Sequence, residues 1–506
     1  MDRPFSFLRK SLLSAAIVSI FSAPVSAGTE DAVKHILPEY LKYLTLPNVA
    51  KESPSDIKAV AEWTRDTFRK HGLNAKLLPD GQTPMVYAEY MEAGEDAPVV
   101  LFYAHMDGQP VNPEQWDQES PWRPVLKTLE GDSWQSKPMT ALTFTTDPEW
   151  RIFARSASDD KAPIMMLLAA IDTLKAENKK PAVNIKVLLD SHEEGGPPTL
   201  IDVINRNKNQ LQADGVVMLD GPMHPSNKPT LVFGHRGASM VRLTVFGPAS
   251  DSHSGHYGNY AANPAFLLAD LLGRMKDDDG RVTIPGYYDA VKFDDEYASA
   301  LDAVPADEAA LMKRLGIATT EKVAGNYQRA INYPSLNING LSAASTEATR
   351  TIIPATATVT MDIRTTKTAT AERQIKLVKD FVIAQGYHLV EDAPTAKERA
   401  EYPRIARFIS HTGTAALQTP LDEPLGQWAL TALAHVSDSE PVIIPMMGGT
   451  VPTSPLVSGL QKPVILLPLV NADNNQHAPN ENLRLGNFFS GTETLYQMFT
   501  TPLMQD

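Results

Sequence analysis

The sequence of 506 residues contains no cysteine. This absence excludes structural disulfides, a thiol nucleophile, a cysteine-bound zinc ion and a lipidated bacterial leader. His, Asp and Glu are then the strong metal ligands that remain. An exported chain without cysteine suits a bacterial periplasm, where stray thiols would be oxidised.

Clustered positive charge is also lacking. The chain has 46 Lys and Arg against 60 Asp and Glu, which gives a formal net charge of −14. Binding to phosphate groups needs clustered Lys and Arg that displace counterions. We therefore expect neither nucleic acid nor an anionic membrane surface as a partner.

Apolar runs as long as the ~20 residues of a membrane-spanning helix are missing too. The N-terminus instead places Arg3, Arg9 and Lys10 before the run SLLSAAIVSIFSAPVSA, which ends in a small-x-small pattern. Serines and Pro24 interrupt this run, which argues against a membrane anchor. The pattern predicts a secretory signal peptide over residues 1–27 and a secreted or periplasmic protein that has no membrane association after its removal.

The length exceeds what one hydrophobic core supports, so two domains are expected. Strands are predicted at MVYAEYM, APVVLFYAHMD, NIKVLLD and GVVMLD, and helices over residues 56–71 and 161–175. The second of these strands is a continuous apolar run, typical of a strand buried on both faces. Alternating strands and helices predict an α/β fold with a mostly parallel sheet.

From about Pro229 the pattern changes. The stretch TLVFGHRGASMVRLTVFG predicts a strand pair, and it is followed by a helix, the strand TATVTMDIRT and a second helix that ends at Gly386. This order predicts a small antiparallel sheet with helices on one face. After about residue 412 the first pattern resumes with PVIIPM and VILLPLV. We expect one domain made of residues 28–228 and 412–506, and a second domain, residues 229–411, inserted into it.

Histidines and carboxylates follow the predicted strands of the first domain. In an open parallel sheet, functional groups gather beyond the carboxyl ends of the strands. The candidates are His105, Asp107, Asp159, Asp160, Glu193, Glu194, Asp220 and His477. Imidazole and carboxylate suit zinc, and one carboxylate can bridge two ions that lie about 3.5–4 Å apart.

Each of these short motifs also has an ordinary interpretation. The pair in SHEEGG could be solvated surface, HMD an ordinary strand end, and SDDK a capped helix start. The ordered set is more specific than any member. HMD, SASDDKAP, HEEGG, MLD, DSHSGHYGN and NQHAPNE together resemble the cocatalytic zinc exopeptidases and deacylases. That family includes carnosinase-type dipeptidases, aminoacylase, glutamate-releasing carboxypeptidase and succinyl-diaminopimelate desuccinylase.

The resemblance covers nearly the whole chain after the leader and is closest to the carnosinase-like dipeptidase branch, through SHSGHYGN, TIIP, DIR and GGTVP. It implies a mostly parallel-sheet α/β zinc-hydrolase catalytic domain with an inserted α+β lid and dimerisation domain. It also implies two Zn²⁺ per chain, for which Mn²⁺ or Co²⁺ could substitute.

The ligand roles come from the same resemblance. It implies that His105 and Asp220 hold one zinc ion, Glu194 and His477 hold the other, and Asp159 bridges both. Asp107 would orient His105, and Glu193 would act as the general base. Neighbouring carboxylates on a loop point in different directions, so one can hold metal while the other moves a proton.

Residues outside the ligand set are implied as well. His253 would stabilise the oxyanion in the active site of the partner in a homodimer, and Arg364 would bind the terminal carboxylate of the substrate. Weaker candidates for substrate binding are Thr351, Gly449 and Thr450. The pattern of the family has a cis peptide at Asp159-Asp160 and glycines where this chain has Ser156 and Ala162. These departures bear on the loop backbone rather than on the ligands.

The resulting hypothesis is a dizinc metallopeptidase that cleaves dipeptides or short peptides and releases a C-terminal amino acid. An N-acyl-amino-acid deacylase would use the same metals and Arg364, and the sequence does not separate the two. A metal-dependent peptide-binding protein without catalysis is the third alternative. Such a protein would be expected to have lost Glu193 or a ligand, and all of them are present.

Overall fold

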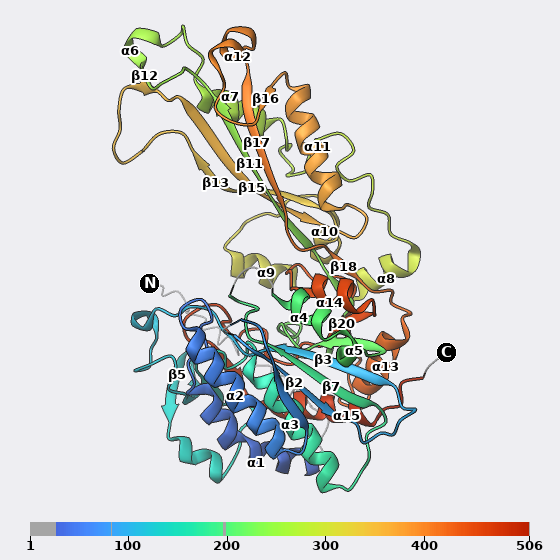
Figure 1. Ribbon diagram of the computed structural model, residues 1–506. Coiled ribbons are helices and arrows are strands. Elements are labelled where there is room, and N and C mark those ends of the chain that lie inside the picture. The colour runs from blue at the N-terminus through green and yellow to red at the C-terminus, as the bar shows by residue number, and fades with distance from the viewer. Residues whose placement is uncertain (1–26, 82, 196–198, 505–506) are drawn as a thin grey trace, which may run out of the picture.

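The computed structural model describes residues 27–81, 83–195 and 199–504 (Figure 1). Helix α1 begins at Ala27, so the predicted signal peptide lies outside the described residues except for its last position. Within the described ranges, no helix is long and apolar enough to cross a membrane.

An eight-stranded sheet forms the lower body in Figure 1. Its strand order is β1-β2-β7-β3-β8-β20-β9-β19. The central strands β7, β3, β8 and β20 run parallel, whereas β1, β2 and β9 contribute antiparallel pairs. The prediction of an α/β fold with a mostly parallel central sheet is confirmed. The strands are β1 Asn74–Leu78, β2 Met85–Tyr90, β3 Val99–His105, β7 Asn184–Asp190, β8 Gly215–Met218, β9 Thr230–Val232, β19 Val442–Ile444 and β20 Val464–Leu466.

Both faces of this sheet are buried. In β3, Val100 and Phe102 belong to one hydrophobic core, and Leu101 and Tyr103 belong to the core on the other face. This explains the continuous apolar run, since both sets of alternating side chains are removed from water. The first core is completed by α1 Ala27–Leu44, α2 Pro54–Lys70, α3 Lys161–Ala176, α13 Pro424–Leu433 and α15 Leu485–Thr500, and the second by α4 Leu200–Arg206, α5 Lys208–Leu211 and α14 Thr453–Leu460.

A five-stranded sheet forms the upper body in Figure 1. In β15, every second side chain is buried, which is the pattern of a sheet with one face covered. Helices α7 Pro264–Gly273 and α11 Ala371–Ala384 supply the covering core. The sheet is antiparallel except for the β16–β17 pair. Its order is β13 Ser335–Ser342, β15 Thr356–Thr365, β11 Gly237–Phe246, β17 Ile405–Thr412 and β16 His388–Val390.

The strand pair predicted for residues 230–247 is wrong. Strand β9 belongs to the eight-stranded sheet, the short β10, Gly234–His235, pairs with β18, Leu417–Gln418, and only β11 lies in the five-stranded sheet. The chain therefore crosses between the two bodies here. A Cβ on Gly234 would lie 2.2 Å from the Leu417 carbonyl oxygen, so glycine permits the close approach of the two crossing segments.

A third sheet was not predicted. Its order is β21 Asn482–Arg484, β6 Arg151–Phe153, β4 Val125–Glu130 and β5 Ser133–Lys137. Its β21–β6 pair joins segments that are distant in the sequence and places Glu481 beside the segment that follows β6. The remaining elements are η1 Pro113–Gln115, η2 Met139–Thr143, β12 Ser252–His253, α6 Ser254–Tyr257, α8 Asp295–Ala303, α9 Glu308–Leu315, α10 Tyr327–Ile331, β14 Ile352–Ile353 and α12 Ala396–Glu401.

Candidate metal centre and active site

The five predicted metal ligands converge at the carboxyl edge of the central strands. They form two groups, His105 with Asp159 and Asp220, and Asp159 with Glu194 and His477. Within each group the possible ligand atoms all lie within 4.8 Å of one another. Asp159 belongs to both groups, which is the arrangement that a bridging carboxylate requires. Each group offers one imidazole and two carboxylates, and this donor set fits a borderline divalent ion such as zinc.

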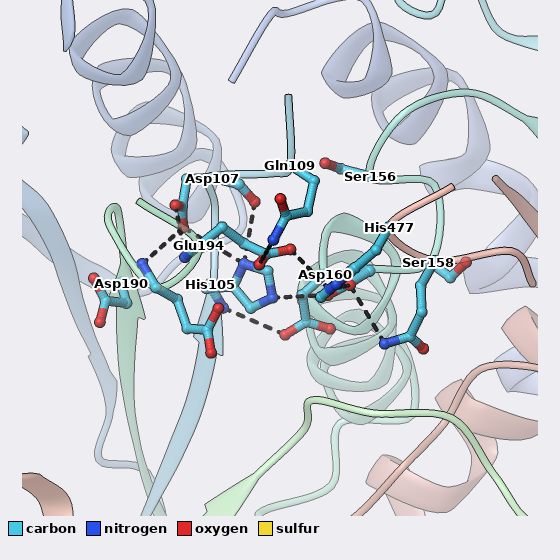
Figure 2. A network of polar contacts seen from close by, with 12 residues as sticks. His105, Asp107, Gln109, Ser156, Ser158, Asp160, Asp190, Glu194 and His477 are labelled. Atoms are coloured by element: carbon cyan, nitrogen blue, oxygen red, sulfur yellow. Dashed lines mark hydrogen bonds and ion pairs between the residues drawn. The ribbon is translucent and has the colours of Figure 1, made fainter. Parts of the chain in front are cut away.

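Asp159 turns one carboxylate oxygen toward each group. Its Oδ1 lies 2.8 Å from Nε2 of His105, and its Oδ2 lies 3.0 Å from Nε2 of His477, which also lies 3.1 Å from Glu194 Oε1. Figure 2 shows the side chains of His105, Glu194 and His477 close together. Burial opposes ionisation, but the two histidines hold the pKa of Asp159 well below its usual range. Hydrogen bonds with Asp159 and Glu194 raise the pKa of His477 to about 10. The carboxylate of Asp159 is thus held between His105 and His477 by strong electrostatic attraction.

Asp107 connects the first histidine to the two glutamates. The Nδ1 of His105 donates to the carbonyl oxygen of Asp107 at 3.1 Å and lies 3.5 Å from its carboxylate. The same carboxylate is fully buried and accepts the backbone N–H groups of Glu193 and Glu194, each at 3.0 Å. Asp107 therefore positions both His105 and the segment that carries the adjacent carboxylates.

Glu193 and Glu194 have different surroundings. Glu194 is in the second ligand group and accepts a hydrogen bond from Gln109, whereas Glu193 is in neither group. Burial raises the pKa of Glu193 to about 9, with a lowering effect from His105 and raising effects from Asp220 and Glu194. A carboxyl group with a perturbed pKa beside a ligand cluster is suited to proton transfer. Glu194 is thus placed as a metal ligand, whereas Glu193 remains available for acid–base chemistry.

Glu481 supports the bridging residue and was not singled out from the sequence, although NQHAPNE includes it. Its fully buried carboxylate accepts the backbone N–H groups of Ser158 and Asp159, each at 3.0 Å, and of Ser156 at 2.9 Å. Arg155 donates to it at 2.8 Å. The predicted cis peptide at Asp159-Asp160 is present in this segment. A carboxylate four residues after His477, at the end of that motif, was the signal that could have identified Glu481.

Comparison with known proteins tests the family resemblance. The profile of peptidase family M20/M25/M40 matches residues 101–501. The chain belongs to this family. It is 26% identical to human Beta-Ala-His dipeptidase over 435 residues, which cover 83% of this chain and 79% of the relative. It is 28% identical to the Cys-Gly metallodipeptidase dug1 of Schizosaccharomyces pombe over 431 residues, 81% of this chain and 82% of the relative.

Solved structures of other proteins have a similar fold. An M20 family metallo-carboxypeptidase from Sulfolobus solfataricus, Sso-CP2, has a TM-score of 0.72 and 25% identity, and the match covers 92% of this chain and 99% of the other. Human carnosine dipeptidase 1 has a TM-score of 0.67 and 22% identity, with coverage of 94% and 99%. The fold predicted from the resemblance is therefore confirmed.

The proposed substrate-carboxylate residues of this M20 chain lie together. Arg364 in β15 donates to the hydroxyl of Thr450 at 2.9 Å, and that hydroxyl donates to the carbonyl oxygen of Arg236 at 2.7 Å. Thr450 and Glu193 both line a cavity of about 230 Å³. Gly449 precedes Thr450 and is exposed. Arg364 thus contacts a residue that lines the same cavity as Glu193.

His253 and Thr351 are placed elsewhere. Strands β12 and β14, which pair His253 with Ile352, lie at the far end of the upper body in Figure 1. The exposed His253 contacts His256, and the ring centroids are 4.7 Å apart. Within one chain, neither His253 nor Thr351 reaches the ligand groups. If His253 contacts an active site, that site must belong to another chain.

The two departures from the M20 pattern have different consequences. Ser156 has φ of 58°, in the left-handed region that favours glycine, and its hydroxyl accepts a hydrogen bond from Asn48 at 3.0 Å. Ala162 lies in the first turn of α3, where alanine is favourable. Lys161 begins this helix, and its buried ammonium group donates to the carbonyl oxygens of Tyr43 and Leu46. Burial lowers the pKa of Lys161 to about 7.

Proposed function

We propose that this chain is a dizinc dipeptidase that hydrolyses the amide bond of small peptides and releases the C-terminal amino acid. The observation that carries the proposal is the pair of ligand groups that share Asp159, with Glu193 beside them but outside both. Two relatives that match most of the chain are named dipeptidases, one for Beta-Ala-His and one for Cys-Gly. Zn²⁺ is the proposed metal, and Mn²⁺ or Co²⁺ could replace it.

In the proposed site, His105 and Asp220 would hold one ion, Glu194 and His477 would hold the other, and Asp159 would be shared between them. When bound, the ions supply Lewis acidity that activates water and polarises the amide carbonyl. Glu193 lies beside both ligand groups, where the positive charge of the ions would favour the ionised carboxylate that a general base requires.

Glu193 then takes the proton of the attacking water and gives it to the leaving amine. Asp107 keeps Glu193 in place through the backbone N–H that it accepts. Arg364 binds the carboxylate of the substrate with its planar fork of donors, next to Thr450. Thr450 and Glu193 line the same cavity of about 230 Å³, so the carboxylate anchor and the base would act on the same C-terminal residue.

Turnover of a substrate panel tests the proposed function. Zinc-loaded protein should hydrolyse free dipeptides faster than the matching N-acetyl-amino acids, and a chelator should abolish both activities. Hydrolysis of only the N-acetyl compounds would identify a deacylase instead. Absence of turnover in the whole panel, from protein with full zinc content, would indicate a binding protein.

We further propose that the active form is a homodimer in which His253 of one chain completes the site of the other. This placement is consistent with the exposed position of His253 far from its own ligand groups. A two-fold dimer has a symmetric interface, so both sites would be completed in the same way.

The dimer proposal predicts complementation between two inactive variants. His253→Ala and Glu193→Gln should each be nearly inactive alone. In a mixed dimer, one site would contain both changes and the other neither, so about half of the wild-type activity per dimer should return. Activity is measured after dissociation and re-association, with mixed dimers verified by mass spectrometry. Verified mixed dimers that stay inactive, or an active monomer, would contradict the proposal.

We also propose that the chain is exported, because residues 1–27 have the charge and apolar pattern of a signal peptide. The exported protein should begin at Gly28, after the small-x-small site. Mass spectrometry of the N-terminal peptide from a periplasmic fraction measures this. An intact leader in that fraction would contradict cleavage at this position.

A further inference from the structure

A second cavity, of about 260 Å³, lies in the inserted segment. It is lined by α9, by α10, by the start of the edge strand β13 and by neighbouring loops. Among the described residues, its lining includes neither Glu193 nor any of the five predicted metal ligands. This cavity is therefore separate from the one that contains Glu193, and a role for it does not rest on the proposed function.

Most of the wall of this second cavity is apolar. Helix α9 contributes Leu311 and Met312, α10 contributes Ala330 and Ile331, and β13 contributes Leu336. Apolar surface that a ligand buries here contributes about 25 cal/mol per Å². An apolar wall with few polar groups is the usual lining of a small-molecule site.

Arg236 is a charged side chain in this wall that has no ion-pair partner among the described residues. Its guanidinium is buried, and Nη2 donates to the Tyr333 carbonyl oxygen at 3.3 Å and to the Ser335 hydroxyl at 2.7 Å. Nη1 has no hydrogen-bond partner among these residues but keeps exposed surface, unlike the sealed Nε. Because Arg236 and Ser335 both line the cavity, Nη1 is the donor that a ligand there can reach.

The protein compensates the charge of Arg236 poorly. Asp362 attracts it, but the Asp362 carboxylate lies 3.4 Å from Nε of Arg364 and accepts a hydrogen bond from Asn337 at 3.0 Å. Burial, followed by repulsion from Arg364, lowers the pKa of Arg236 to about 10. A buried charge without a counter-ion is costly, and an anion that pairs with it recovers part of this cost.

The other charged groups in the wall are already engaged. Lys276 pairs with Glu321 at 2.6 Å, and Glu308 accepts the backbone N–H of Tyr327 at 2.7 Å. The two glutamates disfavour a second negative charge on a ligand, because like charges repel. Neutral groups such as the Tyr327 hydroxyl can add a hydrogen bond but do not select for charge. The cavity thus favours one negative charge beside an apolar body.

We propose that this cavity binds a small monocarboxylate with an apolar tail. The carboxylate accepts hydrogen bonds from the guanidinium of Arg236, which Ser335 holds in place, and the tail packs against α9 and α10. Arginine suits this role because its planar fork of donors matches a carboxylate. A simple carboxylic acid and a free amino acid with an apolar side chain both present this chemistry.

NMR titration of the zinc-loaded protein with isocaproate tests the proposal. Isocaproate should bind at least about tenfold more tightly than isocaproamide, which lacks the charge, and than acetate, which lacks the tail. Leucine adds an ammonium group to the same tail, so the tighter ligand of this pair identifies the class of carboxylate. Arg236→Met should weaken isocaproate binding by at least about tenfold, and Arg236→Lys, which keeps the charge without the fork, should have intermediate affinity.

A second variant tests the apolar part of the site. Ala330→Leu places a larger side chain in the wall, keeps the charge of Arg236, and should weaken isocaproate binding by about tenfold. Arg242→Met, at an exposed arginine of β11, is the matched control and should bind isocaproate as the wild type does. Circular dichroism checks that every variant is folded.

Arg364→Met distinguishes this cavity from the proposed site for the substrate carboxylate, and it should retain isocaproate binding. Binding that survives in both Arg236→Met and Ala330→Leu would overturn the proposal, whether or not Arg364→Met weakens it. Equal affinity for isocaproate and isocaproamide would overturn it too, as would a folded wild-type protein that binds neither isocaproate nor leucine. These outcomes are measured as binding, so a failure of the proposed dipeptidase function would leave them unchanged.

Discussion

Glu193→Gln is expected to lower kcat by roughly 10²–10⁴-fold while the zinc content stays at the wild-type level. The carboxamide has nearly the same shape but cannot accept the proton of the attacking water. Glu193 is outside both ligand groups, so its replacement should leave the metals in place. Steady-state kinetics and elemental analysis of the same preparation measure the two effects together.

The neighbouring Glu194 provides the matched control. Glu194→Gln should lower zinc occupancy, because its carboxylate belongs to the group with Asp159 and His477. Both variants keep the backbone N–H groups that Asp107 accepts, so the loop itself should be preserved. Equal loss of zinc in the two variants would contradict the division of roles between the adjacent glutamates.

Asp159→Asn is expected to remove both zinc ions and with them the activity. One oxygen of Asp159 faces His105 and the other faces His477, so a single substitution weakens both ligand groups. A neutral amide also removes the negative charge that two adjacent cations require. Elemental analysis after gel filtration should find well below one zinc ion per chain.

Asp160→Asn is the control for this prediction. Asp160 is adjacent in the sequence and also buried, but it belongs to neither ligand group and accepts the backbone N–H of His105 at 3.3 Å. Burial raises the pKa of Asp160 well above its usual range, so a neutral amide is a close substitute. This variant should keep its zinc. An Asp159→Asn protein that retains two ions would show that Asp159 does not bridge them.

Much of the metal centre could be predicted from the sequence because its ligands lie in short motifs whose order resembles that of the cocatalytic zinc exopeptidases and deacylases. The predicted strands NIKVLLD and TATVTMDIRT have the bounds of β7 and β15 in the structure. The order of HMD, SASDDKAP, HEEGG, MLD and NQHAPNE then indicated five residues that the structure brings together. The resemblance to the family assigned these residues as ligands. The strands β3, β7, β8 and β20 carry four of them to one edge of the sheet, whereas Asp159 follows β6 of the four-stranded sheet.

The errors arose where a residue acts through distant parts of the chain. The pattern at residues 230–247 is that of two strands, but it does not reveal that β9 and β11 belong to different sheets. Glu481 holds backbone N–H groups more than 300 residues away, and such contacts leave no local signature. The sequence pattern around each of these positions is compatible with several tertiary contacts.

Zinc titration of metal-free protein, with dipeptide hydrolysis followed at each point, tests the central claim most directly. The account predicts that activity appears as zinc is added and reaches its maximum at about two ions per chain, the number that a bridged site requires. Activity that is complete at one ion per chain, or that does not depend on added zinc, would contradict it.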